Sequence, residues 1–365
     1  MLRSPFSWPK IVLSALLAPL AWGCSTSNTV PFRATPVLNL LVGNTRGNNV
    51  VRFDIDTGAF IGEFIPAGSG GLSDPDTLLL GPDANGDGRS DLYVASGALP
   101  GNAGGEGASS VLRYDGVTGA FIDAFVQDDP ATATDETGGL HRPYGMAFGP
   151  DGDLYVSSFR TDEILVYDGD NGAFKSVFAT GNAAAGGLNG PNGLLFAPDG
   201  SLLVTTQGSV AGSFDLGLPS QLLRYDLVTA TATVFASPEP SPDSFGFVSL
   251  LGMAIGPDGD LYVSDFANDI RIYNLETGVQ TGTLATNYTD TIPSGNFIGG
   301  LAFTPDGLLF SVGFDNRDGA NSIGAILRYD SATRQPFPTA GNTGALFTPP
   351  NANLQRPIGV LIYQR

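Results

Sequence analysis

Short apolar runs separated by turn-forming residues recur along this chain, and residues 140–178 show the unit most clearly. The apolar runs cover 146–148, 154–156, 164–167 and 173–178. Pro150-Asp151-Gly152 separates the first two runs, because proline presets φ and glycine accepts a positive φ in a tight turn. Asn171-Gly172 separates the last two. This pattern predicts four antiparallel strands in a meander of about 40 residues.

Two parts of the unit can be counted along the chain. The turn after the first run recurs at 81–83, 149–152, 197–200, 256–259 and 304–307. The third run ends in an aromatic residue followed by Asp or Asn, and it recurs six times, at 52–54, 113–115, 166–168, 224–226, 272–274 and 328–330. Six third runs with only five such turns mean that one first run is missing from the series. It lies at the other end of the chain, because 356–363 repeats the pattern of 142–148.

These counts predict an all-β fold, a six-bladed β-propeller of four-stranded antiparallel blades. The C-terminal strand at 356–363 is expected to complete blade one, which begins at 38–65. Such closure removes the free strand edges that otherwise promote aggregation. The other blades are expected at about 75–126, 143–179, 191–236, 250–285 and 298–339. Fifty Gly and 26 Pro fit a chain of strands and turns, and 42% hydrophobic residues are enough for a core.

The N-terminus differs from the repeats. Arg3 and Lys10 precede an apolar run at 11–22 that is too short to span a bilayer and is typical of a secretory signal peptide. The signal is expected to cover 1–23, because Ala21 and Gly23 are small residues suited to cleavage before Cys24.

Cys24 is the only cysteine of the chain, so no intrachain disulfide can form. The stretch 20–25 resembles a bacterial lipobox, which implies that Cys24 is lipidated and becomes the new N-terminus. The alternative is an ordinary signal peptide with a coincidental thiol. In both cases we expect an exported protein of the cell envelope, periplasm or medium, with 24–37 as a polar tether.

The chain is strongly acidic, with a net charge of −19. Removal of residues 1–23 removes two positive charges and changes the net charge to −21. Such a surface repels nucleic acid and anionic membrane surfaces, so membrane contact is expected only through a lipid on Cys24. We expect a monomer, with a peptide, protein or glycan as partner.

Blade two carries an insertion of six residues in its first turn, and this insertion creates the pattern Asp-x-Asn-x-Asp-Gly-x-x-Asp. Alternating oxygen donors with a glycine at the sharp turn suit a hard cation. The loop resembles the calcium-binding hairpin loops of integrin-type propellers. The predicted calcium ligands are the side chains of Asp83, Asn85, Asp87 and Asp91 and the carbonyl of Arg89. The alternative is a turn that binds nothing.

Long connections between second and third strands are expected at 97–110, 207–220 and 313–324, in blades two, four and six. Antiparallel order places these loops on one face, together with the connections between blades, and the Pro-Asp-Gly turns on the other. Loops on a rigid scaffold commonly form binding sites. The alternative is ordinary variation of surface loops. The predicted binding-face residues are Arg142, Tyr144, Arg160, Asp265 and Arg356.

The unit Leu-x-x-Pro-x-Gly-(Met/Leu/Val)-Ala-Phe-x-Pro-Asp-Gly-x-Leu-Tyr-Val is clearest at 140–167 and 251–273. It resembles the NHL repeat and the six-bladed SMP-30/gluconolactonase propellers. The latter resemblance implies a divalent cation at the channel, held by a Glu, an Asn and an Asp. Asn192 matches the Asn segment, but Asp76 lies two blades earlier and Leu251 stands where that Asp belongs. Around the ring this position is occupied by Ile358, Asp76, Tyr144, Asn192, Leu251 and Gly299.

The repeat pattern also resembles virginiamycin-lyase-like propellers, which use a histidine as general base. The single histidine, His141, precedes the inner strand of blade three. Two hypotheses therefore remain. The first is a non-catalytic propeller that binds a partner on its loop-rich face, with a structural calcium in blade two. The second is a metal-dependent lactonase or lyase that uses Asn192, Asp76 and His141 at the central channel.

Overall fold

The computed structural model describes residues 38–97, 109–129, 131–132, 134–213, 217–319 and 322–364. The predicted signal peptide, tether and lipidation site at Cys24 lie outside the described residues. The described residues form 25 strands and two short 3-10 helices. No helix within the described ranges is long and apolar enough to cross a membrane.

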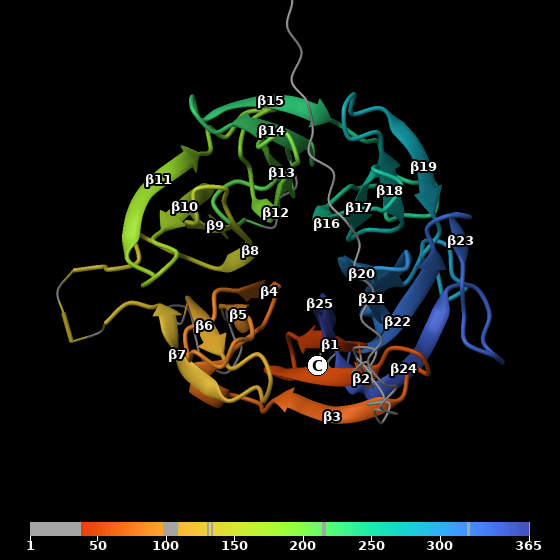
Figure 1. Cartoon of the computed structure of the whole chain (residues 1–365). Helices are drawn as coiled ribbons and strands as arrows, with labels where there is room; N and C mark the ends of the chain where they lie inside the picture. Colours follow the sequence, from red (N-terminus) through yellow and green to blue (C-terminus); the bar gives the residue numbers. More distant parts are fainter. Residues whose placement is uncertain are drawn as a thin grey trace, which may run out of the picture. The chain divides into compact units, whose positions relative to one another are not determined.

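The strands form six sheets arranged as the blades of a ring, which confirms the predicted fold class (Figure 1). Blade one contains β25 (Pro357–Gln364), β1 (Leu38–Asn44), β2 (Asn49–Asp54) and β3 (Phe60–Ile65). Blade two contains β4 (Leu78–Gly81), β5 (Asp91–Ser96), β6 (Ser110–Tyr114) and β7 (Phe121–Val126). Blade three contains β8 (Pro143–Phe148), β9 (Leu154–Ser158), β10 (Glu163–Tyr167) and β11 (Phe174–Thr180).

The remaining blades follow the same order from the channel outward. Blade four contains β12 (Pro191–Phe196), β13 (Leu202–Thr206), β14 (Leu222–Asp226) and β15 (Thr231–Ala236). Blade five contains β16 (Leu250–Ile255), β17 (Leu261–Asp265), β18 (Ile270–Tyr273) and β19 (Gln280–Leu284). Blade six contains β20 (Asn296–Phe303), β21 (Leu308–Asp315), β22 (Ile323–Asp330), β23 (Gln335–Pro336) and β24 (Leu346–Gln355).

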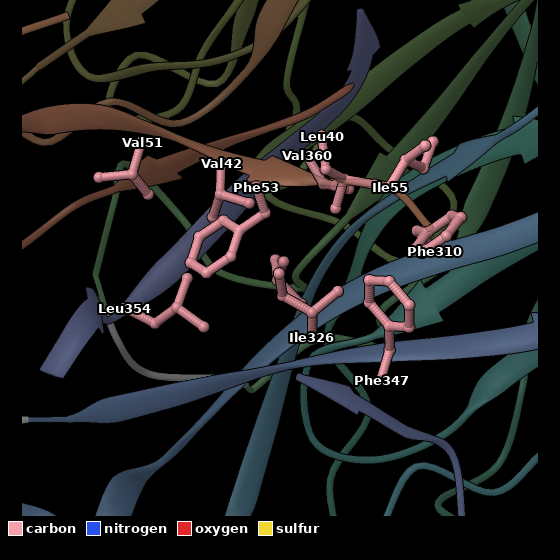
Figure 2. Packing of buried hydrophobic residues seen from close by; sticks show 11 residues of the cluster. Leu40, Val42, Val51, Phe53, Ile55, Phe310, Ile326, Phe347, Leu354 and Val360 are labelled. Carbon is pink, nitrogen blue, oxygen red and sulfur yellow. The ribbon is translucent and has the colours of Figure 1, made fainter. Parts of the chain in front are cut away.

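The C-terminal strand closes the ring. β25 pairs antiparallel with β1, with Leu40 opposite Ile362 and Val42 opposite Val360. A buried apolar cluster then joins blade one to blade six, as Figure 2 shows for Phe53, Phe310 and Phe347 among others. The two ends of the repeat region are therefore held together by strand pairing and by apolar packing, the main favourable term in folding.

Blade six differs from the other blades at its outer edge. β23 has only two residues, and β24 pairs with β22 in addition. The range predicted for this blade, 298–339, stops before β24. β24 contains Pro349 and Pro350 and no regular apolar alternation, so its sequence does not predict a strand. Proline is tolerated there because an edge strand leaves some amide positions unpaired.

The glycine of each Pro-x-Gly motif allows neighbouring inner strands to approach closely. A Cβ atom added to Gly145 would lie 2.1 Å from the carbonyl oxygen of Asn192 in the next blade. The corresponding distance is 2.4 Å from Gly193 to the Leu251 oxygen and 2.0 Å from Gly359 to the Asp76 oxygen. Close backbone approach therefore requires glycine at these positions. The residues that precede these glycines, Tyr144, Asn192 and Ile358, lie together at the centre of the ring.

Small hydroxyl residues of the second strands strengthen the same junctions. The Ser157 Oγ accepts a hydrogen bond from the Gly145 amide at 2.7 Å and donates to the Asn192 carbonyl at 2.8 Å. Thr205 bridges the Gly193 amide and the Leu251 carbonyl in the same way, at 2.8 and 2.6 Å. The Ser or Thr after Leu-Tyr-Val thus joins one blade to the next.

The tyrosine of the Leu-Tyr-Val motif packs between blades. Tyr93, Tyr155 and Tyr262 contact a phenylalanine on the next inner strand edge-on, with ring centroids 5.0–5.2 Å apart. The partners are Phe148, Phe196 and Phe303. Edge-to-face aromatic pairs add about 0.5–1.5 kcal/mol beyond their buried area.

Candidate functional site

The six inner strands line a central cavity of about 580 Å³, which we call the channel. Consecutive residues along most of these strands contribute to it, for example Leu78 to Leu80 and Gly145 to Phe148. The middle layer is apolar and consists of Leu78, Met146, Leu194, Met253, Leu301 and Val360. The far layer is also apolar and includes Leu80, Phe148, Phe196, Phe303 and Ile362.

A second cavity of about 220 Å³ lies where the inner strands begin, on the loop-rich face. We call it the mouth. The two cavities adjoin, because their walls share four residues, Asp76, Tyr144, Leu251 and Ile358. The rest of the wall of the mouth comes from connections and strand starts, namely Gln207, Phe247, Ser249, Phe266, Phe297 and Arg356.

Three charged residues just before the inner strands precede a proline and adopt a left-handed backbone conformation. Asp74 has φ 48°, Arg142 has φ 62° and Arg356 has φ 50°. Non-glycine residues rarely adopt this conformation, which costs roughly 1–2 kcal/mol each. Gly190 occupies the same position before Pro191, with φ 62°. The repeat thus places strained charged residues just before inner strands, one of them, Arg356, in the wall of the mouth, and such strain tends to concentrate at functional sites.

Arg142 contacts two carboxylates, of which one, Asp76, lines the mouth. Its guanidinium donates to Asp76 Oδ2 at 3.2 Å and lies 3.5 Å from Asp74 Oδ2. It also lies 4.8 Å from the centre of the Tyr144 ring, in a cation–π contact. All three charged residues are buried. Arg142 lines neither cavity and is therefore a buried supporting residue behind the wall, not an exposed binding residue.

The pKa of Asp76 is raised to about 7, mainly because the carboxyl group is buried. The positive charges of Arg142 and Arg356 lower this pKa, and the nearby Asp74 raises it. Low-dielectric surroundings disfavour the charged form of a carboxyl group. Asp76 can therefore gain or lose a proton near neutral pH at the surface of the mouth.

Arg356 lines the mouth, and its guanidinium has different partners from that of Arg142. It donates to the Thr45 hydroxyl at 3.2 Å and lies 5.3 Å from the centre of the Phe314 ring. It makes no ion pair with any residue in the described part of the chain, and it is only half-buried. Since an arginine carries five N–H donors, most of its donors remain available for a ligand.

An aromatic cluster forms one side of the mouth. The rings of Phe266 and Phe297 lie 4.5 Å apart, and both contact Phe314, at 5.9 and 5.8 Å. Phe245 contacts Phe297 from outside and is 48% exposed. Sequence reasoning missed this cluster. The available signal was the presence of phenylalanines in or beside connections that are otherwise polar.

Asn192 lies in the channel wall close to the mouth. Its Nδ2 donates to the Leu250 carbonyl at 3.1 Å, and its buried Oδ1 has no hydrogen-bond partner among the described residues. His141 does not line either cavity; its backbone amide donates to Ser158 Oγ and its carbonyl accepts from the Arg160 amide. The structure thus places Asn192 and Asp76 on one cavity wall and His141 outside it.

Asp265 and Arg160 also lie outside the cavity walls. Asp265 is fully buried; its Oδ2 accepts from Arg271 at 2.8 Å, and its Oδ1 accepts from the Ser249 and Ala267 amides. Burial raises the pKa of Asp265, and Arg271 opposes this effect. Asp265 therefore fixes a connection and is not an exposed contact. Arg160 is half-buried and packs beside Gly212.

The blade-two loop has the turn geometry that its sequence suggests. Asp83 accepts hydrogen bonds from the Gly86 and Gly88 amides, both at 2.7 Å. Asp87 accepts from the Arg89 amide at 2.8 Å, and Asp91 accepts from the Ala84 amide at 2.8 Å. Within the described ranges, no three His, Cys, Asp or Glu side chains gather closely enough to hold a metal. The carboxylates retain lone pairs for a cation, although they are not gathered around one point.

Comparison with known proteins found no matching family model and no matching curated protein. A chain of a nidogen/laminin complex has a similar structure, with TM-score 0.58 and 12% identity over 89% of this chain and 98% of that chain. A protein of unknown function from Bacteroides caccae has TM-score 0.54 and 15% identity, over 91% and 100%. Inactive virginiamycin B lyase from Staphylococcus aureus, solved with quinupristin, has TM-score 0.50 and 16% identity, over 88% and 86%. At these identities the comparison establishes the propeller fold alone.

Proposed function

We propose that this protein is an exported, non-catalytic binding propeller that holds a peptide, protein or glycan partner at the mouth of its channel. The observation that carries the proposal is the combination of an available guanidinium on Arg356 with an aromatic wall at Phe266 and Phe297. Arginine and aromatic side chains are enriched among the residues that dominate binding energies. A concave apolar site with few polar groups is also the usual form of a ligand site.

Two observations favour binding over catalysis. Asp76 is held by Arg142, and the positive charge of that guanidinium opposes a cation at the same carboxylate. The cavity walls contain no histidine or cysteine and only one carboxylate among the described residues. A lactonase site with three metal ligands is therefore poorly supported by this donor set.

A second candidate function rests on Asp76. A carboxyl group with a pKa near 7 is suited to general acid–base catalysis, and Asn192 offers an unpaired oxygen on the same cavity wall. A lactone hydrolase or a lyase that acts at the channel is the alternative function. It requires turnover that is lost in Asp76→Asn, whereas the binding function requires no turnover.

The binding proposal can be tested with immobilised full chain and arrays of peptides and glycans. We expect ligands whose affinity falls about tenfold to a hundredfold in Arg356→Met, because a hydrogen bond to a charged group contributes about 1.5–3 kcal/mol. Lys175→Met is the matched control. Its ammonium lies 2.6 Å from Asp153, beside the Pro-Asp-Gly turn on the opposite face. Ligands that bind Arg356→Met and wild type equally would place the binding site elsewhere.

We also propose that the blade-two loop binds calcium and that the chain is lipidated on Cys24. Calorimetric titration is expected to detect calcium binding to wild type and to Asn192→Ala, but not to Asp87→Ala. Asp87 is a predicted calcium ligand in the blade-two loop, whereas Asn192 lies in the channel wall. Loss of binding in Asn192→Ala would place the cation at the channel. Absence of binding to wild type would refute both sites.

A further inference from the structure

Apart from Thr77 and Asn192, which lie close to the mouth, the channel wall below the mouth consists of apolar side chains and glycines. Its middle and far layers consist of Leu, Met, Phe, Val and Ile side chains from all six blades. Water in such a space finds few hydrogen-bond partners. The volume of about 580 Å³ lies within the range of small-molecule sites. The channel therefore favours an apolar occupant.

The charges at the mouth balance. Two carboxylates, Asp74 and Asp76, lie beside the Arg142 guanidinium, and Arg356 lies close enough to lower the pKa of Asp76. A ligand carboxylate would be repelled by Asp76, and a ligand ammonium would be repelled by Arg142 and Arg356. A neutral head group avoids both costs.

The two groups that face the mouth also differ in hydrogen-bonding character. Arg356 can only donate, whereas an ionised Asp76 can only accept. An amide satisfies both, because its carbonyl accepts from Arg356 and its N–H donates to Asp76. An ester or an ether lacks the donor, so it would leave the Asp76 carboxylate without a partner on the ligand side.

We propose that the mouth and channel together bind a neutral amphipathic molecule, an aliphatic chain with an amide head group. The chain lies among the apolar layers, and the amide lies between Arg356 and Asp76. From Asp76 to Leu80 the inner strand advances about 13 Å, which allows a medium-length chain. This inference goes beyond the proposed function, since an aliphatic amide is neither a peptide, a protein nor a glycan, and it rests on that function only in using the same mouth.

The experiment compares three probes of equal chain length, octanamide, octanoate and octylamine, by calorimetry on purified full chain. We expect octanamide to bind about tenfold tighter than either charged probe, because each charged head would be desolvated beside a like charge. Across hexanamide, heptanamide and octanamide, we expect affinity to rise about fourfold for each methylene.

Two variants test where the aliphatic chain of the ligand lies. Met253→Gln places an amide in the middle layer, where Met253 is only half-buried, and should abolish the gain from a longer chain. Met253→Leu should retain it. Val228→Gln is the surface control, because Val228 is 95% exposed on the turn between β14 and β15. The probe comparison needs only wild type, so it decides the inference even if Met253→Gln does not fold.

The outcomes separate this inference from the proposed function. If octanoate or octylamine binds as tightly as octanamide, the neutral head group is wrong. If chain length has no effect, or if Met253→Gln binds like wild type, the apolar channel is not the site. Array ligands that depend on Arg356 while octanamide fails to bind would leave the proposed function intact and overturn the inference alone.

Discussion

Gly359→Ala is expected to destabilise the propeller by about 3 kcal/mol or more. An added Cβ would lie 2.0 Å from the Asp76 backbone oxygen and 3.2 Å from a Leu78 side-chain carbon. The Asp76 oxygen belongs to the backbone, so it cannot move without displacing the inner edge of blade two from that of blade one. Unfolding in urea, with its midpoint and slope, measures the loss.

Gly282→Ala is the matched control for this prediction. Gly282 lies on β19, and the nearest atom to an added Cβ is 3.4 Å away, an ordinary contact. We expect a change within about 1 kcal/mol, and a gain is equally compatible because alanine restricts the unfolded chain. Equal effects of the two substitutions would show that close approach at the channel does not limit stability.

The repeat made most of the fold predictable. Turns such as Pro150-Asp151-Gly152 depend on local backbone geometry, and strands on local alternation, so both appear in the sequence without knowledge of distant contacts. The closure of the ring was also predictable, because 356–363 copies the first run of every other blade. β24 was not, since its pairing with β22 is determined by tertiary context and not by strand propensity.

The site was predictable only where the repeat register determines it. That register places Asp76, Tyr144 and Asn192 at the same level of three inner strands, and the structure has them in one channel wall. The ion pairs of Arg142 depend on its left-handed backbone and on a neighbouring blade. No local pattern in the sequence encodes either of them.

Arg142 and Arg356 occupy the same position of the repeat, but the structure gives them different partners. The sequence could not show this difference, because it depends on contacts with other blades. Both precede a proline and both have positive φ. Arg142 has two buried carboxylates within reach, whereas Arg356 meets Thr45 and the Phe314 ring. Their neighbours, and not their repeat position, therefore make one a structural residue and the other a candidate ligand contact.

Arg142→Met is the second prediction with a large expected effect. It removes the guanidinium that pairs with Asp74 and Asp76 while keeping an apolar side chain of similar length. We expect a loss of about 3–5 kcal/mol, because removal of one partner leaves buried charge uncompensated. Arg317→Met is the control. Its pair with Asp315 is partly exposed, and such pairs contribute at most about 1 kcal/mol.

The loss in Arg142→Met should depend on pH in a defined direction. Burial raises the pKa of Asp76 from 3.8 to about 7, so between these values the folded protein keeps a proton that the unfolded chain releases. Stability contributed by this proton is therefore lost as pH rises, by at most about 1.4 kcal/mol per pH unit. Without Arg142 the pKa of Asp76 rises further and the loss continues above pH 7. Urea unfolding should thus give a larger deficit at pH 8 than at pH 5, and a deficit that is constant or larger at pH 5 would contradict the assignment of Asp76 as the titrating group.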